Sequence, residues 1–136
     1  MTQILFVLRY LWELPQNLVG LTLFLACRRC LSVEHFHGRC FIKTSNFAVS
    51  LGNYIFWTDL DNGLIPLRPN NKTHEYGHAV QSLIFGPLYL FVIGIPSVSR
   101  NLFGILYYRF MKRRWDGYYN GYPEKWADEL GRRLKL

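Results

Sequence analysis

Apolar residues dominate two long segments of the chain, one at its beginning and one in its second half. The first covers residues 4–26, and a helix of about 20 mostly apolar residues is long enough to cross a lipid bilayer. Pro15 predicts a kink in this helix, and Arg9 and Glu13 stand four residues apart, where they can form an ion pair. Two arrangements are open: a kinked transmembrane helix whose polar side packs on the protein, which we favour, or an interfacial helix that lies on the membrane.

Between residues 35 and 57 the pattern changes to short runs of β-branched and aromatic residues. Runs at residues 41–44, 47–50 and 54–57 are typical of strands, and glycines and asparagine between them are typical of turns. This region therefore predicts a small antiparallel sheet of two or three strands. Residues 58–71 are rich in Asp, Asn, Gly and Pro, and they predict a loop.

Three further elements follow the loop. Residues 73–85 predict a helix that the next Gly-Pro pair ends. The second apolar segment, residues 87–111, contains Gly94 and Pro96, so it can be one transmembrane helix or two short helices that form a membrane hairpin. Residues 123–131 predict a short amphipathic helix. The fold class expected from these elements is a membrane-associated α+β protein.

Composition supports contact with a membrane. The 136 residues suit a single domain, 50% of them are apolar, and only 18% are charged, which is below the usual quarter. The net charge is +7, and the basic residues cluster beside apolar runs at residues 28–29, 112–114 and 132–135. Such clusters are typical of the cytoplasmic flanks of membrane segments and not of a nucleic-acid-binding stripe. We expect the protein to lie at the inner cell membrane, with its site on the cytoplasmic side. We expect no nucleic-acid partner.

Three cysteines are too few for a disulfide framework, so reduced thiols are expected in a protein that faces the cytosol. Cys27, Cys30, His35 and Cys40 have the spacing of a retroviral-type zinc knuckle, a module that binds single-stranded nucleic acid. The glycines and aromatic residues usual between knuckle ligands are missing here. A structural zinc site, or a basic module that binds nucleic acid or anionic lipid, is the alternative to ordinary thiols.

Candidate chemistry is concentrated in the run His74-Glu75-x-x-His78. Positions four apart lie on one face of a helix, so both imidazoles can bind one zinc ion while Glu75 reaches a water on it. The alternative is two ordinary histidines on a surface helix. Catalytic zinc needs a third protein ligand, for which Glu124 is the best candidate. Asp128 follows on the same face of that helix and can accept the second N–H of a ligand histidine.

Together, His74-Glu75-x-x-His78 and Glu124-x-x-x-Asp128 resemble the gluzincin metallopeptidases, the family of thermolysin. The resemblance implies that both histidines and Glu124 bind zinc, that Glu75 is the general base, and that Asp128 orients a histidine. The order of elements is similar to that of the integral-membrane gluzincins, including the CAAX prenyl proteases, and of the short minigluzincins. The chain also resembles small bacterial membrane proteins that carry HEYGH and a later W-A-D.

This resemblance implies a membrane-bound zinc metallopeptidase that hydrolyses peptide or protein substrates. Glu75 would take a proton from water and pass it to the leaving nitrogen. Tyr118, Tyr119 or Tyr122 could stabilise the oxyanion, although interfacial packing is the alternative role for each. An extended substrate could add to the edge of the small sheet. The alternative function is a non-catalytic zinc-containing membrane protein that acts as a binding or assembly factor.

The predicted ligands restrict the path of the chain between them. Glu124 can meet His74 and His78 only if all three lie on the same side of the membrane. A single crossing between the motifs would prevent this. We therefore expect residues 87–111 to return as a hairpin or to follow the membrane interface.

Overall fold

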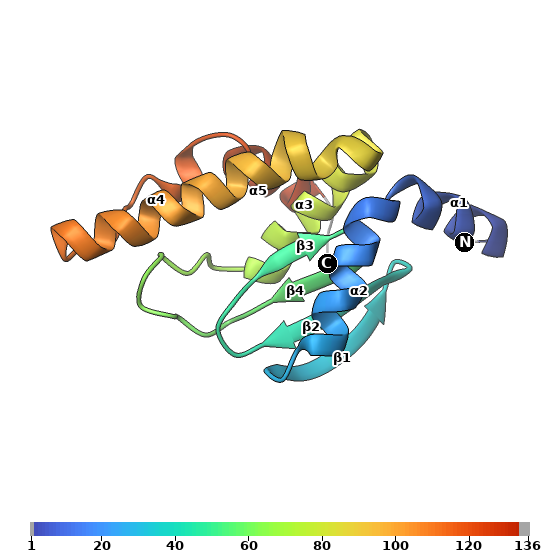
Figure 1. Ribbon diagram of the computed structural model, residues 1–136, viewed down its shortest axis with the longest axis horizontal. Coiled ribbons are helices and arrows are strands. Elements are labelled where there is room, and N and C mark those ends of the chain that lie inside the picture. Colours follow the sequence, from blue (N-terminus) through green and yellow to red (C-terminus); the bar gives the residue numbers. More distant parts are fainter. Residues whose placement is uncertain (1, 134–136) are drawn as a thin grey trace.

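The structure, a computed structural model, describes residues 2–133 and has a mixed α+β fold (Figure 1). Its helices are α1 (Gln3–Trp12), α2 (Leu14–Ala26), α3 (Asn71–Phe85), α4 (Ile95–Met111) and α5 (Glu124–Arg133). Its strands are β1 (Cys30–Phe36), β2 (Arg39–Thr44), β3 (Val49–Leu51) and β4 (Tyr54–Trp57). The α+β class expected from the sequence is confirmed for these residues. Lys135, part of the last basic cluster, lies outside the described residues.

The expected helix over residues 4–26 is two helices with a break at Glu13. The break precedes Pro15, which occupies the first turn of α2, where its missing N–H removes no helical hydrogen bond. The kink expected near Pro15 is present, and each helix by itself is shorter than a bilayer crossing requires. The expected polar side is present, because Glu13, Gln16 and Asn17 are completely buried against the protein.

The sheet has four strands in the order β1-β2-β4-β3, and it is mixed rather than antiparallel. β1–β2 and β3–β4 are antiparallel pairs, whereas β2 and β4 are parallel, with Cys40 opposite Tyr54. Successive residues Phe41-Ile42 and Ile55-Phe56 are all fully buried. Strands that are apolar on both faces need cover on both sides, which places β2 and β4 in the centre and leaves β3 at an edge.

Helices cover both faces of this sheet. Ile42 and Phe56 pack with Phe24 of α2, and Phe41 and Ile55 pack with Ala79 of α3. The motif helix α3 is thus fixed on a rigid surface along its buried side. It begins at Asn71, two residues before the expected start, and ends at Phe85 as expected, before Gly86, whose positive φ of 52° favours glycine.

Two glycines allow α5 to cross α3 at very short distance. A Cβ atom at Gly77 would lie 1.9 Å from the carbonyl oxygen of Ala127, and one at Gly131 would lie 2.2 Å from that of Thr73. Only glycine fits such a contact between backbones. This crossing brings Glu124 at the start of α5 over the motif residues of α3.

The expected membrane hairpin over residues 87–111 is wrong. Helical structure runs without reversal from Leu90 to Met111, beginning with a π-helical turn over Leu90–Gly94 that continues into α4. Pro96 stands at the second position of α4 and has no N–H to donate to the Val92 carbonyl. This carbonyl instead accepts a hydrogen bond from the Tyr122 hydroxyl. By length and composition alone this helix could cross a membrane. Only 11% of its most apolar 18-residue stretch is buried in the protein.

Candidate metal centre

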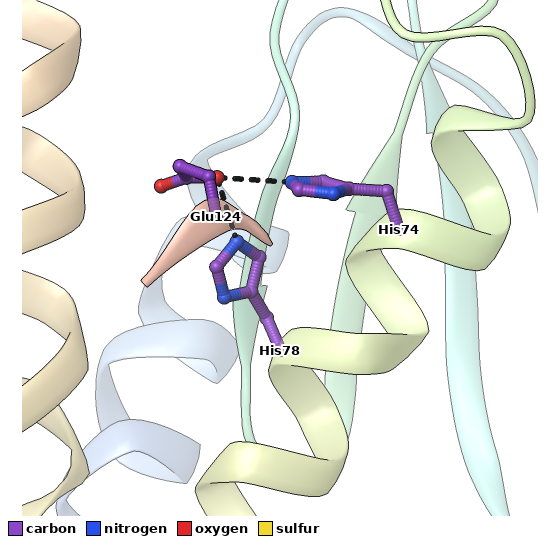
Figure 2. A group of neighbouring side chains, drawn as sticks. All are labelled: His74, His78 and Glu124. Carbon is purple, nitrogen blue, oxygen red and sulfur yellow. Dashed lines mark hydrogen bonds and ion pairs between the residues drawn. The ribbon is translucent and has the colours of Figure 1, made fainter. Parts of the chain in front are cut away.

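Two helices build the site, with His74 and His78 on α3 and Glu124 on the first turn of α5 (Figure 2). The Nε2 atoms of His74 and His78 lie 3.0 and 3.1 Å from the same carboxylate oxygen, Oε2 of Glu124. All three side chains are buried, and their ligand atoms lie within 4.8 Å of one another. The three residues therefore form a group that can hold a metal ion.

Each histidine has its other ring nitrogen held by an acceptor. His74 Nδ1 lies 2.8 Å from Oδ1 of Asp128, which is the contact expected from the sequence, and His78 Nδ1 lies 2.7 Å from the amide oxygen of Gln81. Because carboxylate and amide oxygens accept hydrogen bonds, both Nδ1 atoms carry the proton. A neutral ring held in this way directs its Nε2 lone pair toward the carboxylate of Glu124, which is the form in which histidine binds a metal.

Three lone pairs that converge in a buried site repel one another unless a cation lies between them. A proton can fill part of this role: burial lowers the pKa of His74, but its hydrogen bonds with Asp128 and Glu124 outweigh that effect and raise the pKa to about 10. Likewise, burial raises the pKa of the Glu124 carboxyl, but its bonds to the two histidines outweigh this and lower it. One metal ion would satisfy all three ligand atoms at once, so the residues fit a metal.

Neighbouring elements hold the ligands in place. The second oxygen of Glu124 accepts a hydrogen bond of 2.6 Å from Ser97 of α4. Asp128 receives both the ring of His74 and the guanidinium of Arg68, whose Nε lies 3.2 Å from Oδ1 and whose second nitrogen contacts Oδ2. The Arg68 guanidinium also lies 4.8 Å over the ring of Tyr119.

Sequence reasoning missed Gln81, Arg68 and Ser97. A signal existed for Gln81, which stands three residues after His78 and so lies within reach on the same helix. Arg68 belongs to the loop before α3, and Ser97 to an apolar helix, so neither has a local pattern that points to the site.

Glu75 lies beside the ligand group, and one of its two carboxylate oxygens lacks a hydrogen-bond partner among the described residues. The residue is 5% exposed and lines the cavity next to the site, and the oxygen concerned is Oε2. Burial raises the pKa of its carboxyl above the usual range, although the two histidines oppose this. A buried carboxylate with a free oxygen is suited to accept a proton from a molecule in the cavity.

A cavity of about 550 Å³ opens beside the metal ligands. Its walls are the edge strand β3 with the residues before it, the loop after β4, α3, one face of α4, and Tyr118 and Tyr119. Burial raises the pKa of both tyrosines, so each keeps its hydroxyl proton at neutral pH. The structure does not bring Tyr122 to the cavity wall, because its side chain is half exposed and its hydroxyl bonds the carbonyl of Val92.

The cysteine cluster differs from expectation. Cys27 and Cys30 form a disulfide, and Cys40 is a free, buried thiol in β2. The expectation of reduced thiols is therefore wrong for the first two residues. Because a disulfide uses two of the four presumed knuckle ligands, this structure leaves no zinc knuckle at Cys27, Cys30, His35 and Cys40.

Comparisons of the chain with protein-family models, with curated proteins and with solved structures find no match.

Proposed function

We propose that the protein is a membrane-associated zinc metallopeptidase that hydrolyses peptide bonds. The observation that carries this proposal is the convergence of His74 Nε2, His78 Nε2 and Glu124 Oε2 beside the unpartnered carboxylate of Glu75. Two imidazoles and one carboxylate are the ligand set of many hydrolytic zinc sites. A bound zinc ion would supply Lewis-acid polarisation of the scissile carbonyl and increase the acidity of water.

Glu75 is the general base in this proposal. Its burial in the cavity wall raises the pKa of the carboxyl, so the group can both take a proton from the attacking water and release it to the leaving nitrogen. The position of Glu75 directly after His74 in α3 keeps its carboxylate beside the ligand group.

Tyr118 and Tyr119 are the candidates for oxyanion stabilisation. Both line the cavity, and burial keeps their hydroxyl groups protonated, which makes them hydrogen-bond donors. Tyr119 also contacts the ring of His74 at 5.2 Å between centroids, so it lies close to the ligand group.

The substrate proposed is an extended peptide. β3 is the edge strand of the sheet and forms one wall of the cavity, so a peptide could pair with its backbone and cross in front of the metal ligands. Tyr89 already bonds the carbonyl oxygen of Ser50 at 2.9 Å, which limits such pairing to other positions of this edge.

Hydrolysis of a quenched fluorescent peptide library by the purified, zinc-loaded protein tests the proposal. We expect cleavage by the wild type and its loss in Glu75→Gln with zinc content unchanged. This substitution keeps the shape of the side chain and removes only its basicity. A folded, zinc-loaded wild type that cleaves no member of the library would contradict the peptidase and favour a non-catalytic binding or assembly factor.

A further inference from the structure

One face of α4 and of the turn before it is an exposed apolar stripe. Its residues recur every three or four positions, as one side of a helix requires, and each is between 52% and 79% exposed. They are Phe91, Ile95, Val98, Leu102, Leu106 and Phe110. We call this set the α4 stripe. Soluble proteins usually expose apolar side chains singly, whereas these side chains form one continuous apolar patch.

The opposite face of α4 is fixed to the polar body of the protein. Ser97 donates to Glu124, Arg100 donates to the backbone carbonyls of Gly117 and Tyr118, and Gly104 packs on Ile65. Within the continuous helical segment Leu90–Met111, these contacts lie along the middle rather than at the ends. Glu124 and two polar loops are thus attached to the centre of this segment.

That attachment is incompatible with a bilayer crossing by α4. The helical segment has 22 residues and a length of about 33 Å, close to the roughly 30 Å of a hydrocarbon core. If it crossed, Ile65 at Gly104 and the Gly117 and Tyr118 carbonyls at Arg100 would sit near the centre of the bilayer. The Arg100 guanidinium and the polar loops on either side of these contacts would then lie in hydrocarbon, where charged groups are strongly disfavoured.

The α4 stripe continues onto the N-terminal helices. The indole of Trp12 donates to the carbonyl of Leu83 at the end of α3, and its ring packs against Gly86. Figure 1 shows α1 and α4 along the same long edge of the molecule, with the sheet on the other side. Exposed apolar side chains at this junction connect the two helices, namely Leu8, Leu11, Trp12, Leu83, Ile84 and Leu88.

Basic residues border this surface. Arg109 in the last turn of α4 and Lys112 and Arg113 just after it are exposed, next to Phe110 at the end of the stripe. Positive side chains beside an apolar helix face match an anionic bilayer, in which acyl chains meet the stripe and headgroups meet the cations.

We propose that the protein is monotopic: α1, the end of α3 and α4 lie in the plane of one leaflet of an anionic bilayer, and the chain does not cross it. This arrangement explains how His78 and Glu124, on either side of the apolar segment, meet without a hairpin. It is independent of whether the site hydrolyses peptides, because it depends on the α4 stripe, the basic residues beside it and the contacts that attach α4.

Partition of the full-length protein onto vesicles tests the apolar surface. The probe is phosphatidylcholine vesicles with about 30% phosphatidylglycerol, where we expect Leu102→Asp to lower the partition coefficient at least about tenfold. Leu31→Asp on β1 is the matched control, since Leu31 is 58% and Leu102 is 56% exposed. Equal binding by both variants would overturn the proposal, as would a lipid-free dimer that Leu102→Asp alone dissociates.

Depth measurements separate a monotopic helix from a crossing one. A fluorophore is attached to a single cysteine placed at Ile95, Leu102 or Phe110, in a chain whose two disulfide cysteines are serine and whose third cysteine is buried. Quenching by lipids with shallow or deep quenchers should give the same shallow depth at all three positions. A deep value at Leu102 between shallow values at the ends would show a crossing helix and overturn the proposal.

Discussion

Gln81 should control how tightly the site holds its metal, although it is not a ligand. Its amide oxygen accepts from His78 Nδ1 at 2.7 Å, and its amide nitrogen donates to the Pro123 carbonyl at 3.2 Å, one residue before Glu124. The side chain is completely buried. Gln81→Met keeps its length and removes both hydrogen bonds.

The expected loss follows from these two bonds. Without an acceptor, the His78 ring is free to rotate or to change tautomer, and loss of such a partner typically weakens metal binding about 10- to 100-fold. This corresponds to about 1.4 to 2.7 kcal/mol. The folded state also loses two buried hydrogen bonds of about 1 kcal/mol each.

Gln16→Met is the matched control. Gln16 is also completely buried, and its amide nitrogen makes two hydrogen bonds, of 3.0 Å to Ser82 and 2.9 Å to the Gly86 carbonyl. Among the described residues, Gln16 makes no hydrogen bond to either histidine ring. We expect both variants to unfold at lower denaturant concentration and only Gln81→Met to lose zinc affinity.

Competition with a chelating dye measures the zinc dissociation constants, and urea unfolding monitored by circular dichroism measures the stabilities. Excess zinc should restore the proposed peptide hydrolysis in Gln81→Met. Equal zinc affinity in Gln81→Met and the wild type, or an equal loss in both variants, would refute the role of Gln81 in positioning His78.

Three other predictions concern the metal and the helix crossing. Glu124→Ala should abolish stoichiometric zinc by elemental analysis, and unchanged zinc content would remove Glu124 from the ligand set. A chelator should lower the melting temperature of the wild type, because three buried lone pairs then converge without a metal; an unchanged value in calorimetry would contradict this. Gly77→Ala should destabilise the fold by about 3 kcal/mol in urea unfolding, since its Cβ would lie 1.9 Å from the Ala127 carbonyl oxygen; Gly63→Ala, where a Cβ meets no atom within 4 Å, tests loop strain alone.

The local sequence pattern was sufficient to predict the motif helix α3 but not the strand pairing of the sheet. The spacing of His74 and His78 depends only on helical periodicity, which is why their shared face could be predicted. The parallel pairing of β2 and β4 depends on which strands are covered on both faces, and this involves α2 and α3 together. No short window of sequence contains that information.

The apolar segment shows the same limit more clearly. Its composition is that of a membrane span, and Gly94 and Pro96 suggested a hairpin. The Tyr122 hydroxyl bonds the Val92 carbonyl that Pro96 cannot, and Ser97 and Arg100 attach α4 to the site and to a distant loop. Contacts with residues far along the chain therefore decide the shape of the helix, and the proposed position of the helix on a bilayer depends on the same contacts.

For the candidate centre, the sequence alone determined the types of ligand and which residues share a helix face. His74, His78, Glu124 and Asp128 were all named from spacing, because an α-helix repeats in the same way wherever it lies. Tertiary structure decided that α5 crosses α3 closely enough for one carboxylate oxygen to meet both rings. It also decided that Gln81 holds the second ring, since distances between elements depend on packing that no local pattern encodes.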